Sequence, residues 1–146
     1  MLEIKTIGLE EAKAAADAAI KANPVGERPI AVAVVNRTGE LIYFIRQDGA
    51  FIVESRNAIN KAYTAAIWRS FTGDLLEMVK RRGRDLVWYG GDPQRETVLP
   101  GGAPIKTSDG VVVGAIGISG KRGEDSKDTI KDTELALIGA KAARRF

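Results

Sequence analysis

Two stretches of the chain each contain a pair of strand-like runs, rich in β-branched, aromatic or other apolar residues, joined by a short turn with a glycine. In the first, PIAVAVVN and LIYFIRQ flank RTGE, and in the second, GAPIK and VVVGAIGIS flank TSDG. Such runs favour strands, and glycine supplies the positive φ that a tight hairpin turn requires. The sequence therefore predicts two antiparallel hairpins, over residues 30–46 and 102–119, as the basis of the fold.

The returning run of the second hairpin is almost continuously apolar, and it contains Gly114 and Gly117. Strands buried on both faces have unbroken apolar sequences, so this run is predicted to be a central strand. Glycine within a strand marks a place where another group approaches the backbone closely. Since the two glycines lie on opposite faces by parity, we expect one to accommodate a helix and the other a ligand or a second subunit.

Four other segments have the patterns of helices. They are residues 9–22, residues 53–72 with an alanine stripe, residues 73–82 with Thr72 as N-cap and Gly83 as C-cap, and residues 124–146 with Asp125 or Ser126 as cap. Small residues at positions 58, 62, 65 and 66 would let the second of these helices pack very close to a sheet.

The length and the order of elements predict one α+β domain over residues 1–146, with helices packed on a single antiparallel sheet. The predicted order is α-β-β-α-α-(β)-β-β-α. The bracketed element is DLVWYGG, residues 85–91, which is either a short strand or an aromatic loop. This arrangement is similar to the profilin and PAS architectures.

The chain contains no cysteine and no histidine. Disulfides, thiolate nucleophiles and cysteine-bound zinc are therefore excluded, and the commonest metal ligand and general base is missing; no metal site is predicted. No apolar run approaches the roughly 18 to 20 residues that span a bilayer, and the N-terminus lacks a signal-peptide pattern. We therefore expect a cytoplasmic protein that does not enter a membrane.

Basic residues gather at KRRGR, residues 80–84, and at KAARRF, residues 141–146, although the net charge is only +3. Such clusters can contact phosphates or nucleic acid. Lysine and arginine are also favoured in the last turn of any helix by its dipole. No aromatic alternation or nucleic-acid motif accompanies the charges, so nucleic acid is the least favoured partner.

Three charged residues stand at positions that could face a cleft. Arg46 and Asp48 lie where the first hairpin ends and the chain turns toward the long helix, and Lys61 lies beside the alanine stripe. A lysine that is partly desolvated beside a packed face can bind an anion or transfer a proton. An ordinary Asp-Gly turn and a lysine that reaches into solvent are the simpler alternatives.

Taken together, IAVAVVNRTGELIYFIRQDGA, AINKAYTAA and LPGGAPIK with DGVVVGAIGISG, followed by an aspartate before the last helix, resemble the GlcG/HbpS-like family, or haem-degrading domain. The resemblance covers about residues 6–143. It implies an α+β domain with a five-stranded antiparallel sheet, assembled into dimers or larger homo-oligomers. Relatives include haem-binding proteins and the C-terminal domain of PduO-type corrinoid adenosyltransferases.

The resemblance also implies which residues line or support a pocket near a subunit interface. The matching positions are Asp48, Gly49, Lys61, Thr64, Gly101, Gly102, Pro104, Asp109, Gly110, Gly114, Gly117, Ser119, Gly120 and Asp125. Of the candidates, Lys61 and Asp48 suit acid–base chemistry. The expected ligand-binding residues are Arg46, Thr64, Gly101, Gly102, Pro104, Ser119 and Asp125.

Haem is a cofactor that the resemblance allows, but relatives can place a histidine on the iron and this chain has none. Ligation would have to come from Tyr43, Tyr63, Tyr89 or Met78, from a lysine, or from a hydroxyl. This departure puts haem in doubt while leaving the pocket intact.

Two functions follow from these observations. The favoured one is a homo-oligomeric small-molecule-binding protein, for haem, another tetrapyrrole or a small anionic metabolite, with Lys61 and Arg46 at carboxylates. The alternative is a cofactor-independent catabolic enzyme, an isomerase, dehydratase or hydrolase, that uses Lys61 and Asp48 on a small carboxylate or carbonyl compound.

Overall fold

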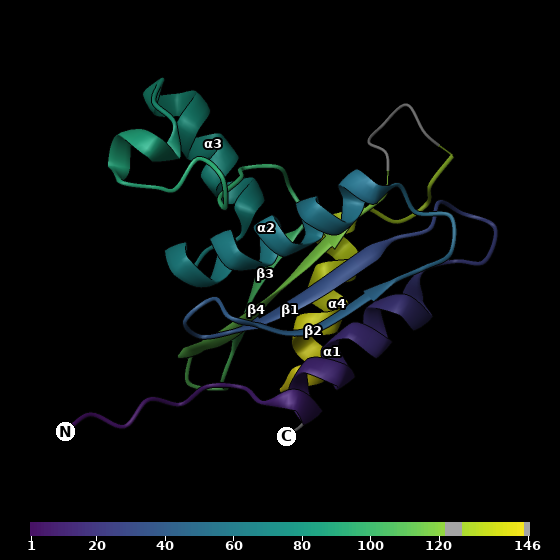
Figure 1. The fold of residues 1–146 in the computed structure, drawn as a ribbon, viewed down its shortest axis with the longest axis horizontal. Coiled ribbons are helices and arrows are strands. Elements are labelled where there is room, and N and C mark those ends of the chain that lie inside the picture. The colour runs from purple at the N-terminus through teal and green to yellow at the C-terminus, as the bar shows by residue number, and fades with distance from the viewer. Residues whose placement is uncertain (122–126, 145–146) are drawn as a thin grey trace.

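The chain forms an antiparallel sheet with helices on both faces. The structure is a computed structural model that describes residues 1–121 and 127–144. Helices α1 (Leu9–Ala22) and α4 (Asp132–Ala143) pack against one face of the sheet, and α2 (Ile52–Trp68) crosses the other (Figure 1). The predicted α+β class is confirmed.

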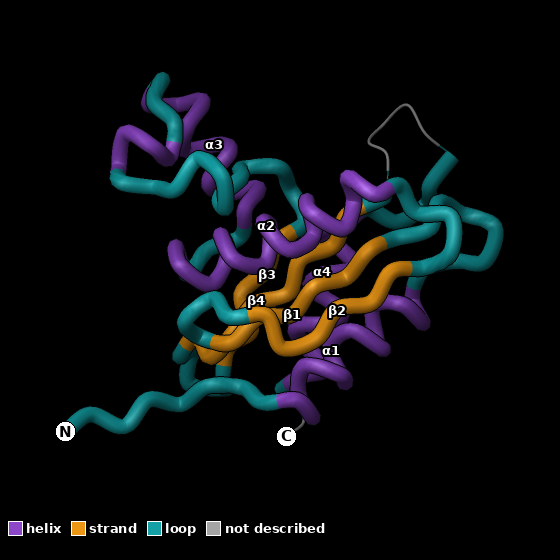
Figure 2. The backbone as a smooth tube through the Cα atoms, in the orientation of Figure 1, coloured by secondary structure: helices purple, strands orange, loops and turns teal. Residues whose placement is uncertain are grey.

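The sheet of the described residues contains four strands in the order β2-β1-β4-β3, and every neighbouring pair is antiparallel. Strands β1 (Ala31–Asn36) and β2 (Leu41–Arg46) form the first predicted hairpin, and β3 (Gly102–Lys106) and β4 (Val112–Ser119) form the second (Figure 2). All residues of β4 are buried, which confirms that this strand is central.

The expectation of a fifth strand is wrong for the described part of the chain. Residues Leu86–Tyr89 form a short 3-10 helix, η1. The Asp85 carboxylate accepts a hydrogen bond from the Trp88 N–H at 3.2 Å, and the Gly91 N–H donates to the Leu86 carbonyl at 2.8 Å. These local bonds use the groups that a strand would offer to a neighbour. The likeness to profilin and PAS domains stays a prediction.

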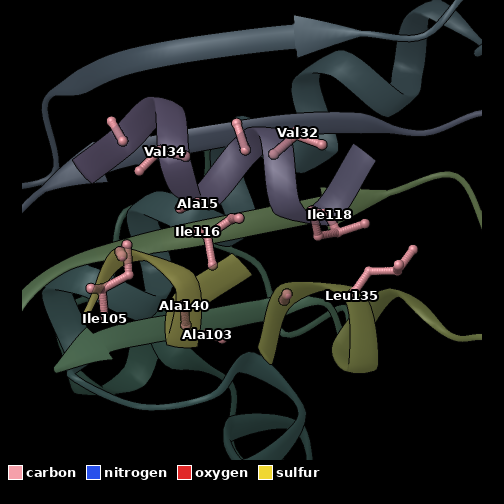
Figure 3. Packing of buried hydrophobic residues seen from close by; sticks show 14 of the residues in the cluster. Ala15, Val32, Val34, Ala103, Ile105, Ile116, Ile118, Leu135 and Ala140 are labelled. Carbon is pink, nitrogen blue, oxygen red and sulfur yellow. The ribbon is translucent and has the colours of Figure 1, made fainter. Parts of the chain in front are cut away.

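Side chains of β1 alternate between two cores. Val32 and Val34 face α1 and α4, where they meet branched side chains such as Ile116 and Leu135 (Figure 3). The core on the α2 side is built almost entirely of alanine: Ala31, Ala33, Val35, Ala58, Ala62, Ala65, Ala66 and Ala115. Because alanine side chains are short, α2 lies close to the sheet.

Gly117 accommodates this close approach. A Cβ at Gly117 would lie 2.1 Å from the Ala58 carbonyl oxygen and 2.5 Å from the Ala62 nitrogen, so no side chain fits. The expectation that one strand glycine accommodates the alanine stripe is confirmed. Gly114 instead faces Ile7, whose side chain would lie 2.7 Å from a Cβ at Gly114. The N-terminal segment of the chain therefore fills the place where the sequence predicts a ligand or a second subunit.

Helix α3 (Thr72–Arg82) follows α2 and ends at Gly83, whose φ of 67° confirms the predicted C-cap. Thr72, expected as the N-cap, is instead the first helical residue. Its hydroxyl accepts a hydrogen bond from the Gly102 N–H at 2.9 Å, so it connects α3 to the start of β3. No helix in the described ranges is long and apolar enough to cross a membrane.

The last helix begins at Asp132, later than expected. The residues before it are bound elsewhere: Asp128 accepts a hydrogen bond from the Arg28 N–H at 3.1 Å, and the Thr129 N–H donates to Glu27 at 2.9 Å. These contacts hold the segment against the loop after α1, which prevents it from joining the helix. The predicted caps, Asp125 and Ser126, lie outside the described residues.

Replacing Gly117 with alanine should destabilise the protein by at least about 3 kcal/mol, because the new methyl would overlap the backbone of α2. Gly73→Ala is the matched control. Gly73 lies in α3, and a Cβ on it would be 3.7 Å from the Pro100 side chain, an ordinary van der Waals distance. The free energy of unfolding should therefore stay unchanged or rise by up to about 1 kcal/mol. Urea denaturation measures both, and a Gly117→Ala variant as stable as the parent would contradict the close packing.

Candidate functional site

A cavity of about 360 Å³ lies between α2, the segment before β3, the end of β4 and the start of α4. Its lining consists of Glu54, Asn57, Lys61, Leu99, Pro100, Ser119, Lys121, Lys131, Asp132 and Thr133. The volume falls within the range of pockets that hold small molecules. Of the sequence-predicted residues, Lys61 and Ser119 are among the lining.

Lys61 is a buried cation of this cavity, only 3% exposed to solvent. Its ammonium donates a hydrogen bond to the Ile118 carbonyl at 2.8 Å and forms an ion pair with Asp132 at 3.3 Å. An ammonium has three N–H groups. One of them has no partner among the described residues, so it is available to a ligand.

Asp132 is the carboxylate that pairs with Lys61. Its other oxygen accepts a hydrogen bond from the Lys121 backbone N–H at 3.0 Å, and the side chain is 12% exposed. Burial raises the pKa of Asp132, and the nearby charge of Glu54 acts in the same direction, whereas Lys61 lowers it. The net effect is upward, so this carboxyl keeps its proton to a higher pH than an ordinary aspartate.

Ser119 and Glu54 form a second polar pair in the cavity. The Ser119 hydroxyl, at the end of β4, donates to a carboxylate oxygen of Glu54 at 2.9 Å. The other Glu54 oxygen has no donor among the described residues, and the Asn57 amide lies one helical turn further along α2. This wall therefore offers acceptors to a ligand, and Lys61 offers a donor. Nowhere in the described ranges do three acidic groups gather to hold a metal ion.

Gly101 and Gly102 bring the backbone before β3 against Lys61. A Cβ on Gly101, where φ is +129°, would lie 3.0 Å from the Lys61 Nζ, and one on Gly102 would lie 2.5 Å from the Lys61 carbonyl oxygen. The Gly102 N–H is bonded to Thr72 and is not free for a ligand. In this structure these glycines make room for Lys61.

Thr64 and Pro104 are buried and do not line the cavity. The Thr64 hydroxyl donates to the Asn60 carbonyl at 2.7 Å and accepts from the Thr97 N–H at 2.9 Å. It therefore positions the segment that carries Leu99 and Pro100 into the cavity wall. Pro104 lies within β3, opposite Ala115.

Arg46 and Asp48 lie elsewhere. Both are exposed, and they line an open hollow together with the C-terminal end of α1 and the loop that follows it. Neither is among the residues lining the cavity that contains Lys61. The carboxylate beside Lys61 is therefore Asp132 rather than Asp48. Asp125 falls outside the described residues.

Glu54 and Asp132 are site residues that sequence reasoning missed. Glu54, Asn57 and Lys61 are spaced i, i+3 and i+7, which places three polar side chains on one helix face. That spacing beside the alanine stripe could have revealed Glu54. Asp132 carries no such signal, because it lies 71 positions from Lys61 in the sequence and meets it only through the fold.

Comparison with known proteins identifies the family. A family model described as haem degrading protein HbpS-like matches residues 7–133. The chain belongs to the HbpS-like family. A relative in Citrobacter freundii, an uncharacterized 15.0 kDa protein of the dhaT-dhaS intergenic region, is 35% identical over 122 residues, 81% of this chain and 82% of that protein. The corrinoid adenosyltransferase PduO of Salmonella typhimurium is 32% identical over 110 residues, 75% of this chain but only 32% of PduO.

Solved structures agree with this assignment. The protein ORFY of Klebsiella pneumoniae superposes with a TM-score of 0.83 at 26% identity, over 100% of this chain and 96% of that one. A double mutant of Streptomyces reticuli HbpS gives 0.79 at 29% identity, over 97% and 89%. A heme complex of PduOC, at 24% identity and a TM-score of 0.76 over 94% of each chain, shares the fold. The family predicted from the HbpS-like motifs is confirmed.

Replacing Lys61 with methionine should raise the pKa of Asp132 further, because it removes a cation and a hydrogen bond that both lower it. A carboxyl with a raised pKa binds more protons in the folded state, so its contribution to stability falls as pH rises. The unfolding free energy of the variant should therefore fall more steeply than that of the parent between about pH 4 and pH 7.

Carboxyl ¹³C NMR titration of Asp132 measures the shift directly. Lys80→Met is the control, since Lys80 faces Glu77 at 3.8 Å on the open surface and should leave Asp132 unchanged. An Asp132 titration that is the same in Lys61→Met and in the parent would contradict the ion pair.

Proposed function

We propose that this protein binds a small anionic molecule in the cavity beside Lys61. The observation that carries the proposal is a buried ammonium with one N–H unused by the described residues at the wall of a 360 Å³ cavity. A buried charged donor favours a charged acceptor, and such hydrogen bonds are short and strong. A carboxylate is the simplest group that fits.

The lining carries three lysines and two carboxylates, and the pairing of these charges decides which cation is left for an anion. The ammonium of Lys121 is already neutralised by Glu27 at 2.8 Å and Asp128 at 3.2 Å. Lys131 also lines the cavity, and none of the described carboxylates pairs with it. The free oxygen of Glu54 suits a hydroxyl or amine on the same ligand. The ligand class is therefore a small hydroxy or amino carboxylate.

Haem is the ligand that the family description raises, and the donors of this cavity do not fit its iron. The chain has no histidine. Of the other candidate iron ligands, Tyr43, Tyr63, Tyr89 and Met78 do not line the cavity. That leaves its lysines and hydroxyls, and Lys61 and Lys121 are already held in ion pairs. Tyr63 lies under Arg95 and Tyr89 packs edge-on against Trp68. The lysines could meet the carboxylates of a tetrapyrrole, but the cavity supplies no histidine, tyrosine or methionine to the metal.

Assembly into a homo-oligomer is part of this proposal. Large apolar side chains lie exposed next to residues of the cavity: Ile52 is 80% exposed, Val53 50% and Leu99 49%. Exposed apolar groups around a polar site are typical of a surface that another subunit covers. The cytoplasmic location stays an expectation from the sequence.

Isothermal titration calorimetry with a panel of hydroxy and amino carboxylates tests the ligand class. Lys61→Met should weaken binding of any ligand found by roughly tenfold to a hundredfold, because a charge-assisted hydrogen bond is lost. Lys80→Met should bind like the parent. Haemin should give no saturable Soret shift at micromolar protein. A saturable shift that disappears in Lys61→Met would contradict the proposed ligand class and assign a tetrapyrrole to this cavity.

A cofactor-independent enzyme is the second candidate, and the Lys61–Asp132 pair is the observation that favours it. A carboxyl with a raised pKa beside an ammonium suits proton transfer to a small carboxylate or carbonyl compound, as in an isomerase, dehydratase or hydrolase. In this arrangement Asp132 takes the acid–base role that the sequence suggested for Asp48.

Variants of Asp132 and Asp48 test which of the two carboxyl groups acts as the acid–base group of such an enzyme. Once a substrate is found, Asp132→Asn should lower kcat by about a hundredfold or more, because the proton-transferring group is gone. Asp48→Asn should leave kcat and KM unchanged, since Asp48 lies in a different hollow. Loss of turnover in Asp48→Asn with normal turnover in Asp132→Asn would contradict the assignment.

A further inference from the structure

A second exposed surface lies at the end of α3 and on η1, away from the cavity. We name it the arginine–tryptophan surface; it consists of Lys80, Arg81, Arg82, Arg84, Trp88 and Tyr89. Figure 1 shows α3 and the segment after it on the far side of α2 from the sheet. None of these six residues lines the cavity beside Lys61. The proposed function leaves this surface without a role.

The cations of this surface are largely uncompensated. The Lys80 side chain is 64% exposed and faces an equally exposed Glu77 at 3.8 Å, a pair of little strength. Within residues 1–121 and 127–144, Arg81, Arg82 and Arg84 form no ion pair. The helix dipole accounts for cations in the last turn of α3. It does not account for Arg84, which follows the C-cap.

The aromatic residues of this surface are unusually open to solvent. Trp88 is 64% exposed and Tyr89 38%, and the neighbouring Val87 is 49% exposed. Leu86 is buried and anchors η1 to the rest of the protein, and the Asp85 carboxylate accepts a hydrogen bond from the Trp88 backbone N–H. A tryptophan whose backbone is held while its side chain is left largely in water indicates a contact surface.

Guanidinium groups lie over these rings. The Arg84 guanidinium carbon is 4.1 Å from the centroid of Trp88, and that of Arg82 is 5.8 Å from the centroid of Tyr89. Tyr89 is supported from the side by Trp68, with ring centroids 6.4 Å apart and planes at 86°. The rings are therefore oriented by the chain before any partner arrives, and each has a cation beside it.

We propose that the arginine–tryptophan surface binds single-stranded nucleic acid with little sequence preference. Exposed bases stack on aromatic rings and on guanidinium planes, while lysine and arginine contact the phosphates. An acidic peptide would satisfy the cations but would offer no flat rings to Trp88 and Tyr89. Single-stranded nucleic acid matches both the charge and the aromatic character of the surface.

From the sequence alone, nucleic acid is the least favoured partner, because no aromatic residues alternate with the cations of residues 80–84. The turn of η1 brings Trp88 back over Arg84 and Tyr89 near Arg82, so the aromatic groups and the cations are neighbours in space. The carboxylate of the acidic neighbour Asp85 accepts a hydrogen bond from the Trp88 backbone N–H.

Fluorescence anisotropy of labelled oligo-dT and oligo-U of about 12 nucleotides, a length within the usual binding-site range, tests the proposal. Affinity should fall with salt, with a logarithmic slope near −3 if the four cations each neutralise a phosphate. Trp88→Ala should weaken binding about tenfold, through lost stacking. Arg84→Glu should reduce the slope by at least about one unit.

Matched controls use similar groups elsewhere on the chain. Lys13→Glu reverses an exposed charge on α1, and Phe51→Ala removes an exposed ring that has Arg28 over it at 5.3 Å. Both controls should bind nucleic acid like the parent. Lys61→Met should also bind it like the parent, so a failure of the nucleic-acid proposal can be told apart from a failure of the cavity proposal. Circular dichroism verifies that each variant is folded.

Three results would overturn the proposal. The first is an unchanged affinity in Trp88→Ala, or an equal loss in Lys13→Glu and Arg84→Glu, which would mean charge attraction alone. The second is displacement of the oligonucleotide by poly-glutamate at equal charge concentration, which would indicate an acidic protein partner. The third is sedimentation showing that Trp88→Ala dissociates an oligomer while no variant binds nucleic acid, which would assign the surface to a contact between copies.

Discussion

The close packing of α2 on β4 is the constraint on which the site depends. Alanines on the helix and Gly117 on the strand let the two backbones lie close together. A Cβ at Gly117 would lie only 2.1 Å from the Ala58 carbonyl oxygen, so no side chain fits there. At this distance the stem of Lys61 runs along the sheet, and its ammonium reaches the Ile118 carbonyl near the end of β4. A larger residue at Gly117 would push α2 outward and move the ammonium with it.

The ammonium of Lys61 then connects three elements that are distant in sequence. It lies on α2, bonds to β4 and pairs with Asp132 in the first turn of α4. A buried ion pair adds little net stability, since both groups lose hydration, but breaking it leaves an uncompensated charge. The ion pair therefore fixes where α4 begins relative to the cavity. Together with the Ile118 carbonyl, it also holds the Lys61 ammonium in one position, which sets the direction of the remaining N–H.

A second buried lysine holds the loops around this site. The Lys121 side chain is 1% exposed and bonds to Asn23 and Glu27 from the loop after α1 and to Asp128 from the segment before α4. These contacts draw the two loops together at one end of the sheet. They also explain why α4 starts at Asp132, and so why its carboxylate, rather than an earlier one, meets Lys61.

Local patterns in the sequence determined the two hairpins, the burial of β4, the alanine stripe of α2 and the family, because each rests on neighbouring residues or on ordered motifs. Local patterns also indicated Lys61, and the family resemblance indicated Ser119. Local hydrogen bonds in η1 replaced the expected fifth strand, and only the tertiary structure paired Lys61 with Asp132 instead of Asp48. The physical reason is that a charge selects its partner by distance in space, which the packing of α2 and α4 on the sheet decides and sequence spacing does not.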